Sequence, residues 1–137
     1  MTFKEEHRDL FSVDFKKYTL AHCISVDCKM GAGIAVPIKK KFKLGGLQKL
    51  VEGIGTAVYH NGVYNLITKR RFFHKPTYST LEASIESMRI HAEDHSITDI
   101  AMPKIGCGLD GLSWPRVRDM IKNIFKDTDI NVLVCYK

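Results

Sequence analysis

The chain has 137 residues, of which 45% are apolar and 26% are charged, so it has the length and composition of one domain with a real core. Lysine and arginine number 21 against 15 aspartates and glutamates, and this net charge of +6 favours anionic partners such as phosphates, nucleotides or nucleic acid without choosing among them. No apolar run approaches a membrane span, and the first residues lack the apolar stretch of a secretory signal. We expect one domain over residues 1–137, with no membrane partner.

The four cysteines, Cys23, Cys28, Cys107 and Cys135, have neither the spacing of a zinc site nor a clear need to form disulfides. A domain of this size folds without covalent staples, so we interpret all four as reduced thiols. This predicts a nuclear or cytoplasmic location. No cluster of metal ligands stands out, and neither a metal nor a cofactor is expected.

In the first half of the chain, the pattern predicts a short strand at residues 10–12 and a buried strand at 18–24. Ile34, Ile38 and Phe42 have helical spacing and predict a helix over residues 33–42, in which Pro37 is tolerated in the first turn. Two apolar runs then flank Asn61-Gly62, a pair typical of a hairpin turn, so we expect strands at 56–59 and 63–68.

In the second half, Ser79 to Glu82 fits a capping box and predicts a helix start. The apolar stripe of that helix is Leu81, Ile85, Met88 and Ala92. A strand at 99–105 follows, and Ser113 with Pro115 opens a second helix. Its stripe is Val117, Met120, Ile121, Ile124 and Phe125. A continuously apolar run at 132–136 predicts a central last strand. Alternating strands and helices with one hairpin indicate an α/β domain with a mixed sheet and helices on both faces.

Ligands of such sheets bind beyond the carboxyl ends of the strands, and the first loop at such a position is residues 25–35. It carries Gly31 and Gly33 at the entrance of a predicted helix. Glycine allows close approach to the backbone, and a helix start offers unpaired N–H groups, a combination that suits a phosphate. An ordinary tight turn explains the same residues equally well.

The second loop, residues 106–111, matches G-x-G-x-x-G after a strand and before a helix. We reject a dinucleotide-binding interpretation, because that motif belongs to the first βαβ unit and only one helix and one strand remain here. Asp110 inside the loop would also repel a pyrophosphate. The carboxylate fits better beside a sugar or a reacting centre, and capping of the next helix is the structural alternative.

The third segment, residues 68–75, interleaves basic and aromatic side chains, as nucleic-acid-binding segments do, although a solvated charged loop is the commoner explanation. Lys69 differs from its neighbours because it ends a strand and can point into a cleft. His22 lies in an apolar strand and is expected to be a core histidine rather than a base. Trp114 is expected to pack, and the lysines at 39–41 and 43 to form a solvated face.

These motifs, taken together and in this order, resemble the macrodomain family, and specifically its terminal ADP-ribose protein glycohydrolase branch. The resemblance covers about residues 8–137. The motifs that carry it are Asp9-Leu10-Phe11, Ala21-His22-Cys23-Ile24-Ser25, Met30-Gly31-Ala32-Gly33-Ile34-Ala35, Leu66-Ile67-Thr68-Lys69, His74-Lys75-Pro76-Thr77-Tyr78 and Met102-Pro103-Lys104-Ile105-Gly106-Cys107-Gly108-Leu109-Asp110.

The resemblance implies a three-layer α/β/α macrodomain sandwich with a mixed central sheet that binds ADP-ribose in a cleft. The acid matching Asp9 reads the adenine, the two glycine loops hold the pyrophosphate and the distal ribose, and Ser25 stands beside that ribose. The residues it implies for binding are Asp9, Leu10, Ser25, Gly31, Ala32, Gly33, Ile34, Ala35, Lys104, Ile105, Gly106, Cys107, Gly108, Leu109 and Lys137.

In this branch the lysine matching Lys69 attacks the anomeric carbon of the distal ribose, and the aspartate matching Asp110 acts as acid and base. The resemblance thus implies a hydrolase that removes ester-linked ADP-ribose from acidic residues of proteins and deacylates O-acyl-ADP-ribose. The asparagine-rich segment of other macrodomain hydrolases is missing at residues 22–25, which favours the lysine route. Arg8 departs from the family, which usually has glycine there, and adds a cation near the adenine end.

Two other classes of function compete with the enzyme. A module that reads ADP-ribose without turnover would use the same glycine loops but would need neither Lys69 nor Asp110. A nucleic-acid-binding domain is suggested by the net charge and the basic segment, but no motif of that class is present. The expected partners are ADP-ribose and ADP-ribosylated proteins, with weak nucleic-acid contact through the basic surface as a further option, and the expected state is a monomer.

Overall fold

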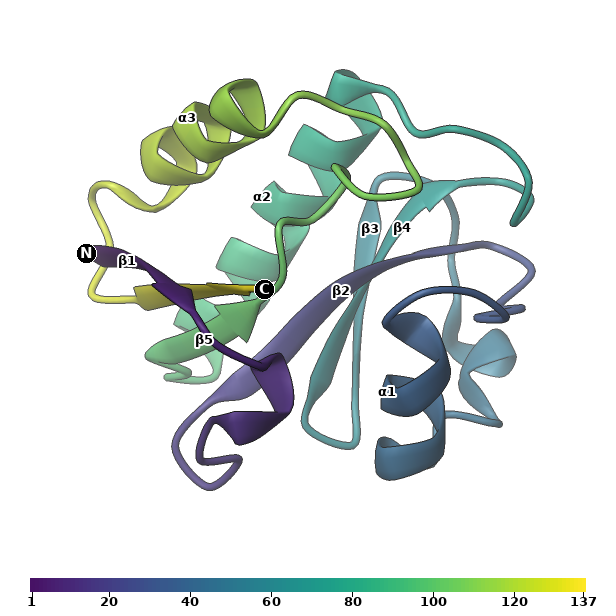
Figure 1. The fold of residues 1–137 in the computed structure, drawn as a ribbon, viewed down its shortest axis with the longest axis horizontal. Coiled ribbons are helices and arrows are strands. Elements are labelled where there is room, and N and C mark those ends of the chain that lie inside the picture. Colours follow the sequence, from purple (N-terminus) through teal and green to yellow (C-terminus); the bar gives the residue numbers. More distant parts are fainter.

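One six-stranded sheet organises the computed structural model, which describes all residues 1–137 (Figure 1). Its strands are β1 (Thr2–His7), β2 (Thr19–Ser25), β3 (Thr56–His60), β4 (Val63–Lys69), β5 (Asp99–Met102) and β6 (Asn131–Tyr136). Their order across the sheet is β1-β6-β5-β2-β4-β3. Every neighbouring pair is parallel except the β3–β4 hairpin, so the sheet is mixed, as predicted.

Helices cover both faces of this sheet and give the predicted three layers. On one face, α2 (Tyr78–Asp94) and α3 (Trp114–Phe125) pack in a cluster of 17 buried residues. On the other face, α1 (Ala35–Phe42) and the 3₁₀ helices η1 (Leu10–Ser12) and η2 (Leu47–Leu50) enclose a cluster of 15. None of these helices combines the length and the apolar character needed to cross a bilayer.

The helical stripes read from the sequence face the core. All four residues of the predicted α2 stripe are buried, but the helix begins at Tyr78 and its capping box pairs Thr77 with Thr80 rather than starting at Ser79. A threonine at this N-cap satisfies backbone N–H groups that the first turn leaves unpaired. Helix α3 follows Ser113 with Pro115 in its first turn, as predicted.

Two expectations near the N-terminus were wrong. Residues 10–12 form the 3₁₀ helix η1 instead of a strand, because the Asp9 carboxylate accepts a hydrogen bond from Phe11 N at 2.9 Å and caps the turn. Strand β1 escaped prediction because its only large apolar residue, Phe3, is half-buried among charged neighbours. Such a charged pattern is ordinary for a sheet edge, where one side of the strand faces water.

The strand predicted at 99–105 is shorter than expected. β5 ends at Met102 because Pro103 has no backbone N–H to continue the ladder. The last strand, β6, lies between β1 and β5, away from both edges, in agreement with its continuously apolar run.

The parallel strands place their carboxyl ends along one edge of the sheet. In sheet order, that edge carries the loops after β1, β6, β5, β2 and β4. These loops contain Asp9, Lys137, the segment 104–110, the segment 25–33 and the segment 69–75, in that order. With neighbouring strands about 4.8 Å apart, this row extends roughly 19 Å from β1 to β4. The topology therefore gathers every segment singled out in the sequence at one edge.

Candidate functional site

A cleft of about 780 Å³ opens at this edge, between the loops that follow β2, β4 and β5. Catalytic and binding sites of α/β proteins lie at such positions. Most of the predicted site residues line it. Those residues are Ser25, Gly31, Ala32, Gly33, Ile34, Ala35, Lys69, Lys104, Ile105, Gly106, Cys107, Gly108, Leu109 and Asp110.

Lys69 and Asp110 meet inside the cleft. Lys69 ends β4, Asp110 lies in the loop before α3, and Lys69 Nζ donates to Asp110 Oδ1 at 2.7 Å. Each side chain is only 15% exposed, so little water screens this charge pair. The alternative that Asp110 caps the next helix is wrong, because Ser113 is the N-cap residue of α3. The two residues chosen for chemistry thus form one ion pair.

Backbone geometry brings the two glycine loops close to each other. Gly33 has φ +61°, and a Cβ there would lie 3.6 Å from the side chain of Leu109 on the opposite loop. Gly106 has φ +73°, and a Cβ would meet Leu81 at 3.0 Å and Leu112 at 3.1 Å. Both residues have a left-handed backbone that side chains disfavour, and at Gly106 a Cβ would also displace the side chains of Leu81 and Leu112. The backbone conformation of the two loops therefore favours glycine at both positions.

At the start of α1, the N–H groups of Ile34 and Ala35 have no backbone partner, whereas Val36 N donates to Gly33 O at 3.3 Å and Pro37 has no N–H. The N-cap residue of α1, Ile34, offers no side-chain hydrogen bond, and Ile34 and Ala35 line the cleft together with Gly31 and Gly33. The first N–H groups of a helix have no partner within the helix and carry partial positive charge. An anionic group such as a pyrophosphate is well accommodated there.

An aspartate that was not predicted, Asp27, organises the wall of the cleft beside Ser25. Its carboxylate accepts hydrogen bonds from the Ser25 hydroxyl, from Phe72 N at 3.1 Å and from Lys29 N at 3.4 Å. Burial raises the pKa of Asp27, but these hydrogen bonds outweigh it and keep the pKa below the usual range. Asp27 therefore stays ionised at neutral pH and joins the loop after β2 to the loop after β4.

Two thiols, Cys23 and Cys107, border the ion pair, and both are held in their protonated form. Burial raises the pKa of Cys23, and the charge of Asp110 raises it further. Burial also raises the pKa of Cys107. Since the thiolate is the reactive form of cysteine, both thiols stay protonated and inert at neutral pH.

His22 is among the residues that line the cleft and is 1% exposed, which fits the expectation of a core histidine. Asn65 donates through its amide to two backbone carbonyls, Val58 O and Val63 O, so its Oδ1 faces His22. His22 Nε2 lies 2.6 Å from that oxygen and therefore donates to it, while Nδ1 has no partner. Burial lowers the pKa of His22 to about 4, so the ring is neutral at pH 7.

Because His22 is buried and neutral, we expect the free energy of unfolding to decrease in mild acid. The unfolded chain takes up the proton below about pH 6.5, whereas the folded protein takes it up only near pH 4, so the free energy of unfolding falls as the pH drops through that window. The expected contribution is about 3 kcal/mol between pH 6.5 and pH 4. Urea unfolding of the wild type and of His22→Gln at several pH values measures this contribution. If the free energy of unfolding depends on pH equally in both proteins, the prediction is contradicted.

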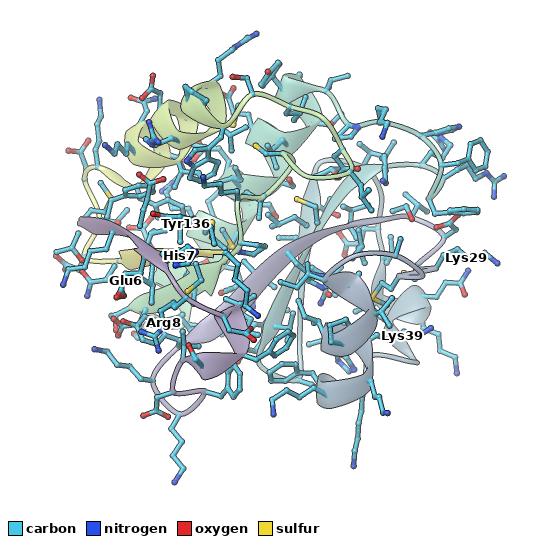
Figure 2. All side chains as sticks on the ribbon, in the orientation of Figure 1. Glu6, His7, Arg8, Lys29, Lys39 and Tyr136 are labelled. Carbon is cyan, nitrogen blue, oxygen red and sulfur yellow. The ribbon has the colours of Figure 1, made fainter.

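The predicted adenine-side residues lie apart from the cleft walls. Asp9, Leu10 and Lys137 do not line the cleft; Asp9 caps η1 and pairs with Lys137 Nζ at 2.9 Å, and Leu10 is buried. The Arg8 guanidinium is held by the side chain and carbonyl of Ser12. Figure 2 shows Arg8, Glu6, His7 and Tyr136 gathered on one side of the molecule, with Lys29 and Lys39 on the other.

Nine residues that line the cleft lie in or beside the segments singled out in the sequence but were not assigned to the site. They are His22, Cys23, Lys29, Met30, Phe72, Phe73, His74, Lys75 and Pro103. Residues 72–75 belong to the third segment singled out in the sequence, but of that segment only Lys69 was assigned a role in the site. The position of residues 72–75 shortly after Lys69, at the carboxyl end of β4, was the signal that they belong to the same site. Trp114, as expected, packs: it is buried, and its Nε1 donates to Glu5 at 2.6 Å.

Sequence comparisons show that the chain is similar to macrodomain proteins, among them ADP-ribose glycohydrolases. A family model described as "Macro domain" matches residues 22–121. The chain is 49% identical over 133 residues to a human protein, ADP-ribose glycohydrolase OARD1, which covers 92% of this chain and 86% of that protein. It is 27% identical over 108 residues to DNA ADP-ribosyl glycohydrolase of Thermus aquaticus, covering 68% of this chain and 30% of that protein.

Comparison with solved structures gives the same fold. The macrodomain of Mycobacterium tuberculosis DarG superposes with a TM-score of 0.88 at 20% identity, covering 99% of this chain and 98% of that one. The structure of Thermosipho africanus DarTG in complex with ADP-ribose gives a TM-score of 0.82 at 20% identity, covering 99% of this chain and 42% of that one. The three-layer sandwich expected from the sequence is thereby confirmed.

Proposed function

The chain belongs to the Macro domain family, and we propose that it is a hydrolase that binds ADP-ribose in the cleft and releases it from acidic residues of mono-ADP-ribosylated proteins. The same chemistry would deacylate O-acyl-ADP-ribose whose acyl group is on the anomeric oxygen, because both substrates then carry an ester at the anomeric carbon of the distal ribose. The observation that carries this proposal is the contact between Lys69 and Asp110 in the cleft, since a module that only binds ADP-ribose needs neither residue.

In the proposed reaction, Lys69 is the nucleophile and Asp110 moves the protons. A lysine at neutral pH is mostly protonated and must lose a proton before it attacks. Asp110 Oδ1 is 2.7 Å from the Lys69 ammonium and is placed to accept that proton. The Lys69 nitrogen then bonds to the anomeric carbon while the bond from that carbon to the ester oxygen breaks, and the acidic residue leaves as a carboxylate.

Release of the lysine adduct completes the cycle. Asp110 first gives the proton that it took from Lys69 to solvent. Water then attacks the anomeric carbon while Asp110 takes its proton, the bond from that carbon to the Lys69 nitrogen breaks, and the freed amine takes the proton back from Asp110, which restores the ion pair. Binding of the diphosphate at the N-terminus of α1 and of the distal ribose beside Ser25 would hold the anomeric carbon in place. Because the thiols of Cys23 and Cys107 stay protonated, neither of them would replace Lys69 as the nucleophile.

The decisive experiment is incubation with a protein that carries ADP-ribose on a glutamate, with the release of free ADP-ribose followed in time. O-acetyl-ADP-ribose with its acetyl group on the anomeric oxygen serves as the small substrate with the same bond. We expect release from both. A well-folded protein that binds ADP-ribose but cleaves neither substrate would be a reader module instead.

ADP-ribose binding itself is expected to depend on Asp9. Asp9→Ala removes a carboxylate at the adenine end of the strand row, and we expect the Kd for ADP-ribose to rise about tenfold. Calorimetry measures the Kd, and the melting temperature with and without ADP-ribose gives an independent reading.

Asp9→Asn is the matched control for this variant, because it keeps an oxygen that can accept from Phe11 N and cap η1. If Asp9→Ala binds ADP-ribose as tightly as the wild type does, Asp9 only caps the turn and pairs with Lys137.

A further inference from the structure

The mouth of the cleft beside Lys69 carries an exposed surface that the proposed chemistry does not use. We call it the acceptor rim. It consists of Lys29, Phe72, Phe73 and Lys75, which line the cleft, together with the exposed Arg70 and Arg71, which lie in the chain between Lys69 and Phe72. The Phe72 and Phe73 side chains are 55% and 68% exposed, and Leu109 across the cleft is 69% exposed. Large apolar side chains gathered at a cleft mouth mark an interaction surface more often than chance exposure does.

The rim is held in place at both ends. On one side, Phe72 N donates to Asp27 Oδ2 at 3.1 Å, and on the other, Lys75 Nζ donates to Leu109 O. Val26 N also donates to Lys69 O at 2.9 Å, at the base of the loop. These contacts tie the loop after β4 to both walls of the cleft. The rim therefore presents its side chains in a fixed arrangement next to Lys69.

The charge of the rim is unbalanced. Its four cations, Lys29, Arg70, Arg71 and Lys75, are exposed, and none of them takes part in an ion pair. The two nearby carboxylates are engaged elsewhere, Asp27 by three hydrogen bonds and Asp110 by Lys69. Lys39 of α1 lies on the same side of the molecule as Lys29 (Figure 2). An acidic partner would complement this surface.

The aromatic geometry favours a polypeptide over a nucleic acid. Phe72 and Phe73 meet edge to face, with ring planes at 87°, and Phe73 meets His74 at 77°. Single-stranded nucleic acids bind by stacking successive bases on aromatic faces, and rings turned perpendicular to one another do not offer a continuous row of such faces. They offer instead an apolar corner that aliphatic or aromatic side chains can fill.

The position of the rim decides which part of a substrate reaches it. Asp9 and Lys137 lie at the β1–β6 end of the strand row, and the rim follows β4 near the other end. In Figure 1 the loop after β4 lies far from the C-terminus. With adenine at the first end and the anomeric carbon at Lys69, the leaving group would emerge at the rim.

We propose that the acceptor rim binds the polypeptide that carries the modification, and that it selects ADP-ribosylated residues flanked by other acidic residues. This inference rests on the proposed function, because it assigns the leaving-group side of that reaction. The cations would pair with flanking carboxylates, and Phe72 and Phe73 would contact an apolar side chain of the same segment. A small ester such as O-acetyl-ADP-ribose has no group that reaches the rim.

The test compares three substrates: an acidic peptide with one ADP-ribosylated glutamate, the same peptide with glutamine and asparagine in place of the flanking acids, and O-acetyl-ADP-ribose. The wild type is expected to have a lower KM for the acidic peptide than for the neutral one, and added salt should remove the difference. Arg70→Gln with Arg71→Gln should raise the KM for the acidic peptide about fivefold, as expected for two exposed ion pairs, and leave O-acetyl-ADP-ribose cleavage unchanged.

Lys16→Gln with Lys126→Gln is the matched control, because it removes the same charge from exposed positions outside the cleft and should change none of the three rates. Phe72→Ala with Phe73→Ala should lower the ratio of kcat/KM for the acidic peptide to that for O-acetyl-ADP-ribose.

Equal KM values for the two peptides in the wild type, or equal effects of the arginine variant on all substrates, would overturn the proposal. Stronger inhibition by a single-stranded oligonucleotide than by the unmodified acidic peptide would also overturn it. Failure to cleave any substrate would instead refute the proposed function.

Discussion

Lys69→Ala is expected to abolish release of ADP-ribose from an ester-linked glutamate while ADP-ribose still binds. Without the amine there is no group to form the bond to the anomeric carbon, and loss of a nucleophile lowers the rate by about 10³-fold or more. Binding should persist, because the glycine loops and the N-terminus of α1 are untouched. Single-turnover release measured beside calorimetry with ADP-ribose separates the two effects.

Lys69→Arg is the matched control, because Asp110 would otherwise lose its partner in a position that is only 15% exposed. Arginine keeps the positive charge beside the carboxylate, yet it does not act as a nucleophile since its guanidinium stays protonated. We therefore expect a folded, inactive protein. Wild-type rates in both lysine variants would refute the covalent route and favour water activated by Asp110.

Asp110→Ala is expected to fail at a different step and to accumulate a covalent intermediate. Lys69 can still attack after it gives its proton to water, but no carboxylate remains to take the proton from the water that releases the adduct. Intact-protein mass spectrometry after incubation with ADP-ribosylated protein should show one ADP-ribose bound to the variant and none bound to the wild type.

The adduct should disappear when Asp110→Ala is combined with Lys69→Arg, because the attacking amine is then absent. Peptide mapping should place the ADP-ribose on Lys69. An Asp110→Ala protein that turns over at the wild-type rate would show that another group, or solvent, moves the proton.

The central strands and helices of the fold could be predicted because local patterns encode them. The apolar runs of β2, β4 and β6, the Asn61-Gly62 turn and the stripe of α2 each point to the element that forms. Strand β1 was missed because what makes it a strand is its partner β6, more than a hundred residues away, and not its own composition. The turn at Asp9 depends on one side-chain hydrogen bond, which apolar periodicity does not reveal.

The site shows the same division. Lys69 could be placed in a cleft because it ends a strand. The glycines could be chosen because they lie in loops between a strand and a helix, and Gly33 and Gly106 do adopt the left-handed backbone that favours glycine. The contact between Lys69 and Asp110 joins residues 41 positions apart, so only the resemblance to the macrodomain family could lead one to expect it. Asp27 had no signal at all, since its role depends on Phe72 N, 45 positions further along the chain.

The pairing of β1 with β6 has a consequence for how the protein is made. Thr2 bonds to Asn131 across 129 positions, so β1 leaves the ribosome long before its partner strand exists. The β2–β4 ladder and the Lys69 end of the cleft can assemble while β1 still has an open edge. Lys4, Glu5 and Glu6 make that waiting strand a poor template for pairing with other chains. During synthesis, the charged edge therefore protects the nascent protein from aggregation until β6 arrives.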